Sequence, residues 1–240
     1  MAVEILAKKK VLIIGATGGI GSEATRLIRK GQANVFITGR NEEKLKQTAR
    51  DNDIPAEQAF LLDVTDAKAV QTLATTIYDR VGPLDILINA AGIGYLNPLE
   101  NTGAEDFSKV IDVNLKGAFH LMRYFLPPMK EARKGLVINI PGVLGKAPMA
   151  GAAAYAASKY GLNGMVKSIR EELKRTEVRI TNLYLGGVDS DFWDNIDMRV
   201  NRDKFINAKE AGRAIWFLCQ QPVSGVVSEM VIQPFNHQAI

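Results

Sequence analysis

Short apolar runs alternate with amphipathic stretches along almost the whole chain. The first run, residues 11–14, is continuously apolar and ends at a glycine. Runs of this kind are typical of strands buried on both faces of a parallel sheet. The amphipathic stretches between them have the spacing of helices that cover such a sheet. This alternation predicts an α/β protein whose parallel sheet has helices on both faces.

The predicted elements follow one another without a linker or an internal repeat. Strands are expected at residues 11–14, 34–38, 59–62, 86–88, 136–140, 178–183 and 226–232. Helices are expected at about 20–30, 42–50, 66–78, 104–125, 152–174 and 208–219, the fourth ending before Pro127-Pro128. Residues 187–207 lack a clean period and are predicted to form a lid-like insertion. We therefore predict one domain over residues 1–240, with a Rossmann-type, doubly wound sheet of about seven strands.

Composition excludes several classes of site. Cys219 is the one cysteine, and the two histidines, His120 and His237, lack metal-ligand spacing with other donors, so no metal site is expected. The net charge of +4 is spread along the chain, which argues against nucleic-acid binding. No apolar run has the length of a signal peptide or a membrane span, which favours a cytoplasmic location.

A glycine-rich turn follows the first predicted strand. It reads Ile14-Gly15-Ala16-Thr17-Gly18-Gly19-Ile20-Gly21. Glycines permit a tight turn and close approach of the backbone to a ligand, and a helix starting there would offer its free N–H groups to a pyrophosphate. A tight strand-to-helix turn that binds nothing is the alternative. Its place in an alternating chain favours dinucleotide binding.

The residues at the end of the second strand indicate which dinucleotide binds. Sites for NAD usually place an acid here to hold the ribose hydroxyls. This chain has Gly39 followed by Arg40, whose guanidinium can pair with a 2′-phosphate. A surface arginine that closes the loop is the alternative. The missing acid favours NADP(H).

Tyr155 and Lys159 form a third signal on the long helix 152–174. Residues four apart share a helix face, and a nearby cation favours the phenolate by lowering the phenol pKa. Tyr155 could then donate or accept a proton near neutral pH. An exposed pair of helix residues is the alternative.

Together these signals resemble the short-chain dehydrogenase/reductase family over nearly the whole chain. Further segments resemble its motifs in the same order: Leu62-Asp63-Val64, Asn89-Ala90-Ala91-Gly92 and Asp112-Val113-Asn114. The resemblance implies that Tyr155 passes a proton to a carbonyl oxygen while NADPH delivers hydride to carbon. Lys159 would hold the nicotinamide ribose and lower the tyrosine pKa, and Asn114 would hold a water that links Lys159 to solvent.

The resemblance also implies a set of cofactor-binding residues. These positions would contact the phosphates, the adenine, the riboses or the nicotinamide, besides Tyr155 and Lys159 themselves. They are Gly15, Thr17, Gly18, Gly19, Ile20, Gly21, Arg40, Asp63, Val64, Asn89, Ala90, Gly92, Gly186, Val188 and Ser190.

The chain departs from the family pattern at residue 142. A serine usually lies thirteen residues before the tyrosine, whereas this chain has Gly142. Losing such a polarising donor typically lowers the rate by about 10²–10³. A backbone N–H, a water or a substrate hydroxyl could replace it, and a Gly142→Ser variant should gain activity if the hydroxyl limits the rate. The family's Pro-Gly pair is Leu185-Gly186 here, where the leucine could fill the floor of the pocket, and its later hydroxyl is Ser190.

Apolar and aromatic residues would surround the open side of the site. This composition predicts an apolar or aromatic substrate of moderate size, although ordinary packing explains Val143 and Leu144 equally well. The Ala-rich start of the tyrosine helix and the helix before it could form a dimer interface, and two dimers would give a homotetramer. The expected substrate-side residues are Ile93, Tyr95, Gly142, Val143, Leu144, Met149, Tyr184, Phe192, Trp193 and Met198.

Two functions from different classes remain open. Tyr155, Lys159 and Asn114 favour an NADPH-dependent enzyme that interconverts a carbonyl and an alcohol. Gly142 favours a catalytically weakened NADP(H)-binding protein that acts as a sensor or structural partner. The sequence favours the enzyme, acting on a small molecule with neither a nucleic acid nor a membrane as partner.

Overall fold

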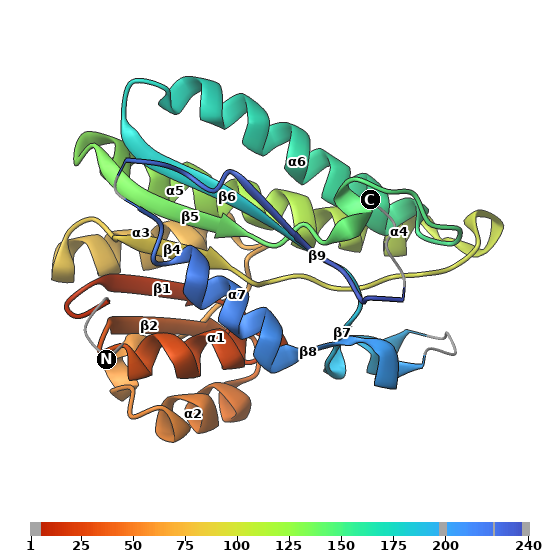
Figure 1. Cartoon of the computed structure of the whole chain (residues 1–240), viewed down its shortest axis with the longest axis horizontal. Coiled ribbons are helices and arrows are strands. Elements are labelled where there is room, and N and C mark those ends of the chain that lie inside the picture. The colour runs from red at the N-terminus through yellow and green to blue at the C-terminus, as the bar shows by residue number, and fades with distance from the viewer. Residues whose placement is uncertain (1–5, 197–200, 223, 237–240) are drawn as a thin grey trace.

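The computed structural model describes residues 6–196, 201–222 and 224–236. Within these residues, seven parallel strands form one sheet in the order β3-β2-β1-β4-β5-β6-β9 (Figure 1). This confirms the predicted Rossmann-type α/β fold. The strands are β1 (Lys10–Ile14), β2 (Asn34–Gly39), β3 (Ala59–Leu61), β4 (Ile86–Asn89), β5 (Lys134–Asn139), β6 (Glu177–Leu185) and β9 (Glu229–Ile232).

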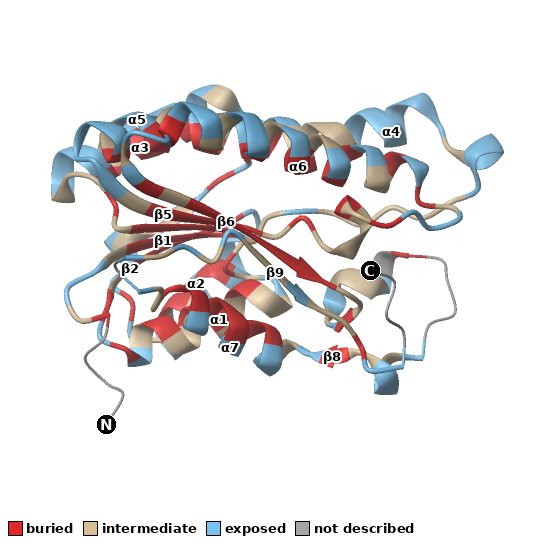
Figure 2. Ribbon diagram, turned by 45° about the horizontal axis from the view of Figure 1, so that its top comes forward, coloured by how far each residue is buried: buried red, intermediate tan, exposed pale blue. Residues whose placement is uncertain are grey.

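Helices cover both faces of the sheet (Figure 2). Helices α1 (Gly19–Lys30), α2 (Glu42–Asp51) and α7 (Ala208–Leu218) share one apolar core with the first face. Helices α3 (Ala67–Val81), α5 (Gly117–Glu131) and α6 (Ala153–Leu173) share a second core with the other face. Helix α4 (Ala104–Ile111) packs against α6. Asp66 caps α3 by accepting hydrogen bonds from Lys68 N and Ala69 N.

Strand β1 explains why the apolar runs are continuous. Val11 and Ile13 belong to the core under α1, whereas Leu12 and Ile14 belong to the core under α5. Successive side chains of a strand point to opposite faces, so both faces need apolar residues. The strand pairs with β2 on one side and with β4 on the other. The order of strands reverses here, and ligands of such sheets bind beside the carboxyl ends at this point.

The predicted helix over residues 104–125 is wrong in two respects. A π-helical stretch, Asp112–Lys116, separates α4 from α5, and α5 continues through Pro127 and Pro128 to Glu131. Two prolines remove two backbone donors, yet the helix does not end there. Met129 is fully buried, and Ala132 N donates a hydrogen bond to Pro128 O, so packing and one further helical bond hold the last turn.

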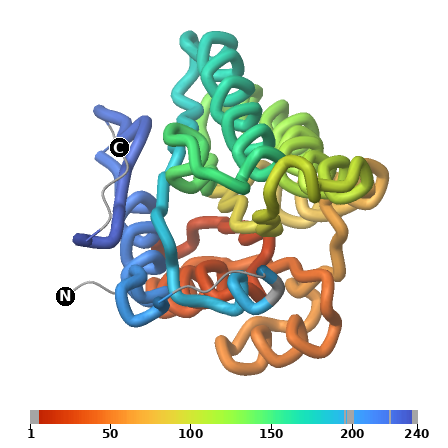
Figure 3. Tube along the Cα trace, turned by 90° about the vertical axis from the view of Figure 1, so that its right-hand side faces the viewer, coloured from red at the N-terminus to blue at the C-terminus, as the bar shows by residue number. Residues whose placement is uncertain are grey.

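The segment after β6 runs from the sheet to the side of α1, as the light-blue tube in Figure 3 shows. Its two short strands, β7 (Val188–Asp189) and β8 (Ile206–Asn207), pair in parallel, and short 3₁₀ turns lie between them. Its role as a lid stays a prediction, and Met198 lies outside the described residues. In the part of the chain that the structure describes, no helix is long and apolar enough to cross a membrane.

Candidate active site

The turn after β1 is packed so tightly that Gly15 and Gly21 have no space for a side chain. Gly15 has φ of +77°, and a Cβ at this position would lie 2.9 Å from Ala91 N. A Cβ at Gly21 would lie 2.2 Å from Gly15 O, because α1 starts directly against the turn. Glycine is the residue that tolerates both the positive φ and the contact. The predicted Gly15–Gly21 stretch is therefore one compact unit, and it also meets the loop that follows β4.

Helix α1 begins with no side chain covering its N-terminus. Gly18 is the N-cap residue, with no side-chain hydrogen bond, and the first turn carries no acid. The free N–H groups and the helix dipole therefore attract an anion at this point. Ser190 of the segment after β6 lies close by, since a Cβ at Gly19 would be 2.6 Å from Ser190 Cβ.

Arg40 follows β2 beside the same turn. Its neighbour Gly39 packs against Thr17, since a Cβ at Gly39 would lie 2.6 Å from Thr17 Cγ2. Hydrogen bonds from Thr65, with a contribution from the Arg40 charge, hold the pKa of Asp63 below its usual range. Val64, next to Asp63, is buried. The exposed Arg40 and Asp63 line a cavity of about 530 Å³ together with Thr65, Ala104, Glu105, Ser108, Lys109, Asp112 and Val113.

Asn114 lies in the π-helical stretch and holds the loop after β4. Its Oδ1 accepts from Ile93 N at 2.9 Å, and its Nδ2 donates to Ile93 O at 3.0 Å. The same Nδ2 donates to Ser158 Oγ at 3.1 Å, so the amide bridges this loop to α6. A Cβ at Gly92 would lie 3.2 Å from Asn114 Oδ1 and 3.4 Å from Lys159 Nζ. The structure thus brings Gly92, Asn114 and Lys159 together.

Tyr155 and Lys159 lie on one face of α6, as their spacing predicts. Lys159 Nζ is 5.4 Å from the centroid of the Tyr155 ring and donates to Ile140 O at 3.3 Å. Burial lowers the pKa of Lys159 to about 8. Burial also raises the pKa of Tyr155, which opposes the expected lowering by the lysine. In the protein alone, desolvation therefore outweighs the attraction of the two groups, and the phenol is neutral at pH 7.

Asn89 and Ala90 occupy the carboxyl end of β4, next to the glycine turn. Asn89 is buried, and its Oδ1 accepts a hydrogen bond from Ala91 N at 3.3 Å. Its Nδ2 lies 3.4 Å from Asn139 Oδ1 on β5. A Cβ at Gly15 would lie 3.0 Å from Ala90 O, so these residues form the wall opposite the turn.

Gly142 has a backbone conformation that other residues rarely adopt. Its φ is +70° and its ψ is 167°, a combination that is essentially confined to glycine. A Cβ here would lie 3.8 Å from Tyr155 Oη and 3.5 Å from Leu185 O. A serine at this position would have space but would be strained. Position 142 is therefore not an ordinary serine site that has lost its hydroxyl.

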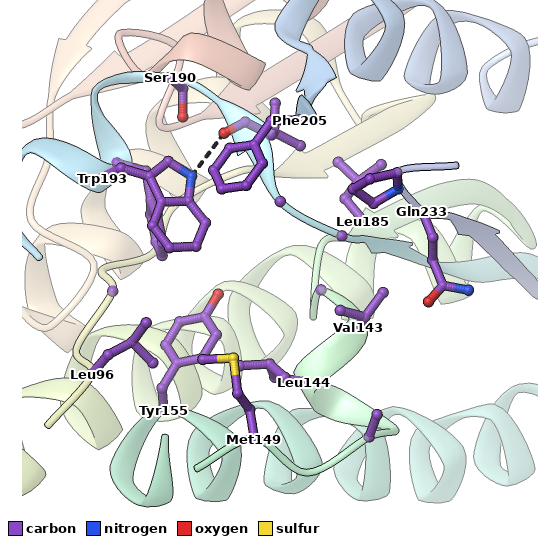
Figure 4. A pocket seen from close by; sticks show the side chains of 18 of the residues that line it. Leu96, Val143, Leu144, Met149, Tyr155, Leu185, Ser190, Trp193, Phe205 and Gln233 are labelled. Carbon is purple, nitrogen blue, oxygen red and sulfur yellow. Dashed lines mark hydrogen bonds between the residues drawn. The ribbon is translucent and has the colours of Figure 1, made fainter. Parts of the chain in front are cut away.

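An apolar cavity of about 650 Å³ opens in front of Tyr155 (Figure 4). The Tyr155 hydroxyl points into it, and the rings of Trp193 and Phe205 lie opposite, with centroids 4.9 Å apart. Phe192 contacts Tyr155 edge to face at 6.0 Å. The predicted residues that line the cavity are Ile20, Tyr95, Gly142, Val143, Leu144, Met149, Tyr155, Gly186, Val188, Ser190, Phe192 and Trp193.

Two predicted substrate residues do not line the cavity. Tyr184 is fully buried on the α6 side of β6, where its hydroxyl donates to Asn163 Oδ1 at 2.8 Å. Strand side chains alternate, so its neighbour Leu185 faces the cavity instead. Ile93 packs against the core between the sheet and α5, because Asn114 fixes its backbone. Neither residue therefore lines this cavity as predicted.

Sequence reasoning missed several residues at the site. Ser158 is buried, accepts from Asn114 and donates to Tyr155 O at 2.7 Å. Leu96, Phe205 and Gln233 line the cavity from three separate segments. Leu185, which the sequence offered as a filler of the pocket floor, also lines the cavity, but no sequence spacing signals the others. Among the described residues, no three His, Cys, Asp or Glu side chains gather in a way that could hold a metal ion.

Comparison with known proteins identifies the family. The family model for short chain dehydrogenase matches residues 9–201. A 3-oxoacyl-(acyl-carrier-protein) reductase of Rickettsia typhi is 36% identical over 192 residues, covering 79% of this chain and 76% of the relative. An uncharacterized oxidoreductase of Staphylococcus epidermidis is 29% identical over 228 residues, covering 95% and 98% of the two chains.

Solved structures agree with this relationship. A metagenomic short-chain oxidoreductase in complex with NADP has a TM-score of 0.83 at 29% identity, covering 96% of this chain and 99% of its own. Serine dehydrogenase from Escherichia coli also has a TM-score of 0.83, at 26% identity, and the match covers 95% of this chain and 99% of that enzyme's chain. The chain therefore belongs to the short-chain dehydrogenase family of oxidoreductases.

Proposed function

We propose that this protein is an NADP(H)-dependent oxidoreductase that interconverts a carbonyl and an alcohol on an apolar or aromatic small molecule. One observation carries the proposal: the hydroxyl of the half-buried Tyr155, with a buried lysine beside it, points into an apolar cavity of about 650 Å³. Ligand-binding pockets are typically lined by apolar side chains and contain a small number of polar groups that converge on the ligand. Tyr155 and Lys159 are such a pair.

The residues around the glycine turn fit the proposed cofactor. Gly15 and Gly21 let the turn pack closely against the loop after β4 and against the start of α1, and the uncapped N-terminus of α1 attracts the charge of a pyrophosphate. Arg40 supplies a cation where a 2′-phosphate would lie, and this position carries no acid. Relatives in complex with NADP support the same choice. When bound, NADPH supplies the hydride that reduces the carbonyl carbon.

Tyr155 acts as the proton donor in the direction of reduction. Its raised pKa keeps the phenol protonated at neutral pH, so the proton is available to the substrate oxygen. The Lys159 ammonium, largely charged below its pKa of about 8, stabilises the phenolate that remains. Asn114 holds the loop around Gly92 close to Lys159 Nζ, which keeps the lysine in place. The oxidation direction needs the phenolate and is therefore favoured at higher pH.

A Tyr155→Phe variant tests the proton donor. NADPH oxidation is followed against a panel of aromatic and aliphatic ketones, aldehydes and quinones, and turnover should fall by about 10²–10⁴. Tyr160→Phe is the matched control, because Tyr160 is 43% exposed on the same helix and should be replaceable without effect. Equal rates in wild type and Tyr155→Phe would refute the assigned role.

Calorimetry with NADPH and NADH tests the cofactor. Binding should favour NADPH, and Arg40→Gln should weaken NADPH binding by about tenfold while leaving NADH binding nearly unchanged. Lys44→Gln, an exposed cation on α2, is the control. The proposal fails entirely if neither dinucleotide binds to the wild type.

Gly142 supports a second candidate, an NADP(H)-binding protein with weak catalysis that acts as a sensor or structural partner. No hydroxyl is present at this position, and its backbone conformation disfavours one. This candidate predicts tight NADPH binding together with turnover that Tyr155→Phe does not reduce. Turnover lost in Tyr155→Phe would exclude it.

A further inference from the structure

The loop after β5, residues 141–147, forms one wall of the cavity and lies against α6. Val143 and Leu144 line the cavity, and Gly142 lies beside the Tyr155 hydroxyl. A Cβ at Gly145 would lie 3.2 Å from Lys159 O, so the loop touches the backbone of the helix that carries both proposed catalytic side chains. Whatever holds this loop therefore sets the position of the cavity wall relative to Tyr155.

Two polar contacts hold the loop from behind. Asn163, one turn beyond Lys159 on α6, donates from Nδ2 to Gly145 O at 3.3 Å. Lys146 donates from Nζ to Glu229 Oε2 on β9 at 2.5 Å. One contact joins the loop to α6, and the other joins it to the last strand of the sheet. Together they fix the loop to two separate elements.

Tyr184 connects these two contacts. Its hydroxyl donates to Asn163 Oδ1 at 2.8 Å and lies 3.4 Å from Glu229 Oε1. The Lys146 ammonium lies over its ring, 4.5 Å from the centroid. Because Tyr184 is fully buried, it gives the network a rigid base. The tyrosine that the sequence placed in the cavity thus lies behind the cavity wall.

Glu229 is held as a carboxylate within this network. Burial opposes its ionisation, but the hydrogen bond from Lys146 and the charges of Lys146 and Arg170 lower the pKa of Glu229 overall. Arg170 Nη1 is 3.9 Å from Glu229 Oε1, yet its guanidinium also donates to Ile180 O and Ser228 O. Arg170 is therefore bonded to the backbone of β6 and of the residue before β9. Lys146 is the partner that links Glu229 to the loop.

We propose that Glu229, Lys146 and Asn163 are positioning residues that hold the loop 141–147 against Tyr155 and thereby set the turnover rate. The inference rests on the proposed function. None of the three is among the described residues that line the cavity, so they act through the loop and not on a substrate. Displacing a cavity wall relative to a reacting group lowers the rate without abolishing binding.

The experiment compares Glu229→Gln, Lys146→Met and the double variant with wild type. Steady-state kcat and KM are measured with NADPH and the best carbonyl substrate of the panel. Amide hydrogen exchange is measured at Gly145, Lys146 and Ala147, whose N–H groups donate to Gly142 O and Val143 O within the loop. Lys146→Arg tests rescue by a cation of similar reach. Glu171→Gln, which loses a pair with Lys174 on the exposed face of α6, is the control.

Each single variant should lower kcat by about tenfold with KM changed by less than about twofold, and exchange in the loop should rise. The double variant should be no slower than the slower single variant, because both changes remove the same contact, the pair between Lys146 and Glu229. Lys146→Arg should recover most of the rate, and Glu171→Gln should match wild type. Unchanged kcat in Glu229→Gln, or an equal loss in Glu171→Gln, overturns the inference. Absence of any wild-type turnover instead refutes the proposed function, and this inference with it.

Discussion

The turn after β1 and the cavity in front of Tyr155 are built in different ways. Main-chain contacts within residues 15–21 define the turn, where one added carbon at Gly21 would overlap Gly15 O. The cavity is assembled from side chains of separate segments, including Leu96, Met149 and Phe205. Positions fixed by such backbone contact, Gly15 and Gly21, have no space for a side chain, whereas a wall of apolar side chains can repack. This difference predicts that the half of the site around the glycine turn, the proposed cofactor half, is strict and tolerates few substitutions. The half around the apolar cavity, the proposed substrate half, should be adaptable and tolerate more of them.

Lys159 lies between the two halves, and among the variants that compare the two halves its removal should give the largest effect. Lys159→Met should lower turnover by about 10²-fold or more, because the cation that stabilises the phenolate is lost. The same variant should be more stable than wild type at pH 7, by on the order of 2 kcal/mol, because burial lowers the lysine pKa from 10.5 to about 8. Thermal or urea unfolding across pH checks this.

The pH range in which Lys159→Met is more stable than wild type follows from the lysine pKa, which is about 8 in the folded state and 10.5 in the unfolded state. Below pH 8 both folded and unfolded states carry the proton, and the folded state bears the full cost of the buried charge. Between pH 8 and 10.5 the unfolded state binds more protons, so wild-type stability rises and the difference disappears. Lys167→Met, which removes a cation on the same helix, is the control. A Lys159→Met variant that is less stable than wild type at pH 7 would contradict the desolvation argument.

Gly21→Ala tests whether the cofactor half is strict. The new Cβ would lie 2.2 Å from Gly15 O, so α1 must shift away from the turn. We expect a loss of about 1–3 kcal/mol in the free energy of unfolding and at least about tenfold weaker NADPH binding. Gly164→Ala is the matched control, because nothing lies within 4 Å of a Cβ there and alanine favours a helix. Calorimetry and urea unfolding of both variants provide the measurements, and equal behaviour would contradict the comparison.

The same difference explains what could be predicted from the sequence. The sheet follows from apolar runs whose alternate residues enter the two cores, and the turn follows from glycines that steric contact requires. Tyr155 and Lys159 follow from helical spacing. These features depend on residues near one another in the chain, so their pattern is visible without the fold.

Other features depend on contacts that sequence spacing does not encode. Alternation places Tyr184 and Leu185 on opposite faces of β6, but the fold decides which of these faces meets the cavity and which meets α6. The π-helical stretch Asp112–Lys116 carries Asn114, whose amide bonds to Ile93, a residue 21 positions earlier in the chain. The prolines at 127 and 128 lie inside a helix whose last turn carries Met129, a fully buried residue. In each case tertiary packing overrides local preference.

Gly142→Ser tests whether the loop after β5 tolerates substitution, like the adaptable half of the site, or does not, like the strict half. Sequence alone suggests that a serine here restores a missing hydroxyl and raises activity. The φ of +70° at Gly142 instead predicts a loss of about 1–3 kcal/mol in stability, with no gain in kcat. Gly142→Ala is the control, because it adds the strain without the hydroxyl. A serine variant faster than both wild type and Gly142→Ala would show that the loop can relax, and that position 142 belongs to the adaptable half.

Met149→Leu should give the smallest effect and tests that adaptability directly. Met149 is 37% exposed at the cavity mouth, and Figure 4 shows it beside Leu144 and Tyr155. Leucine keeps nearly the same volume, so stability should change by less than about 0.5 kcal/mol and kcat should stay constant. KM for the best carbonyl substrate should shift by about two- to fivefold, since a flexible thioether is replaced by a branched chain. A change in kcat as large as that of Lys159→Met would mean that the mouth is as strictly built as the glycine turn, and the contrast between the two halves would fail.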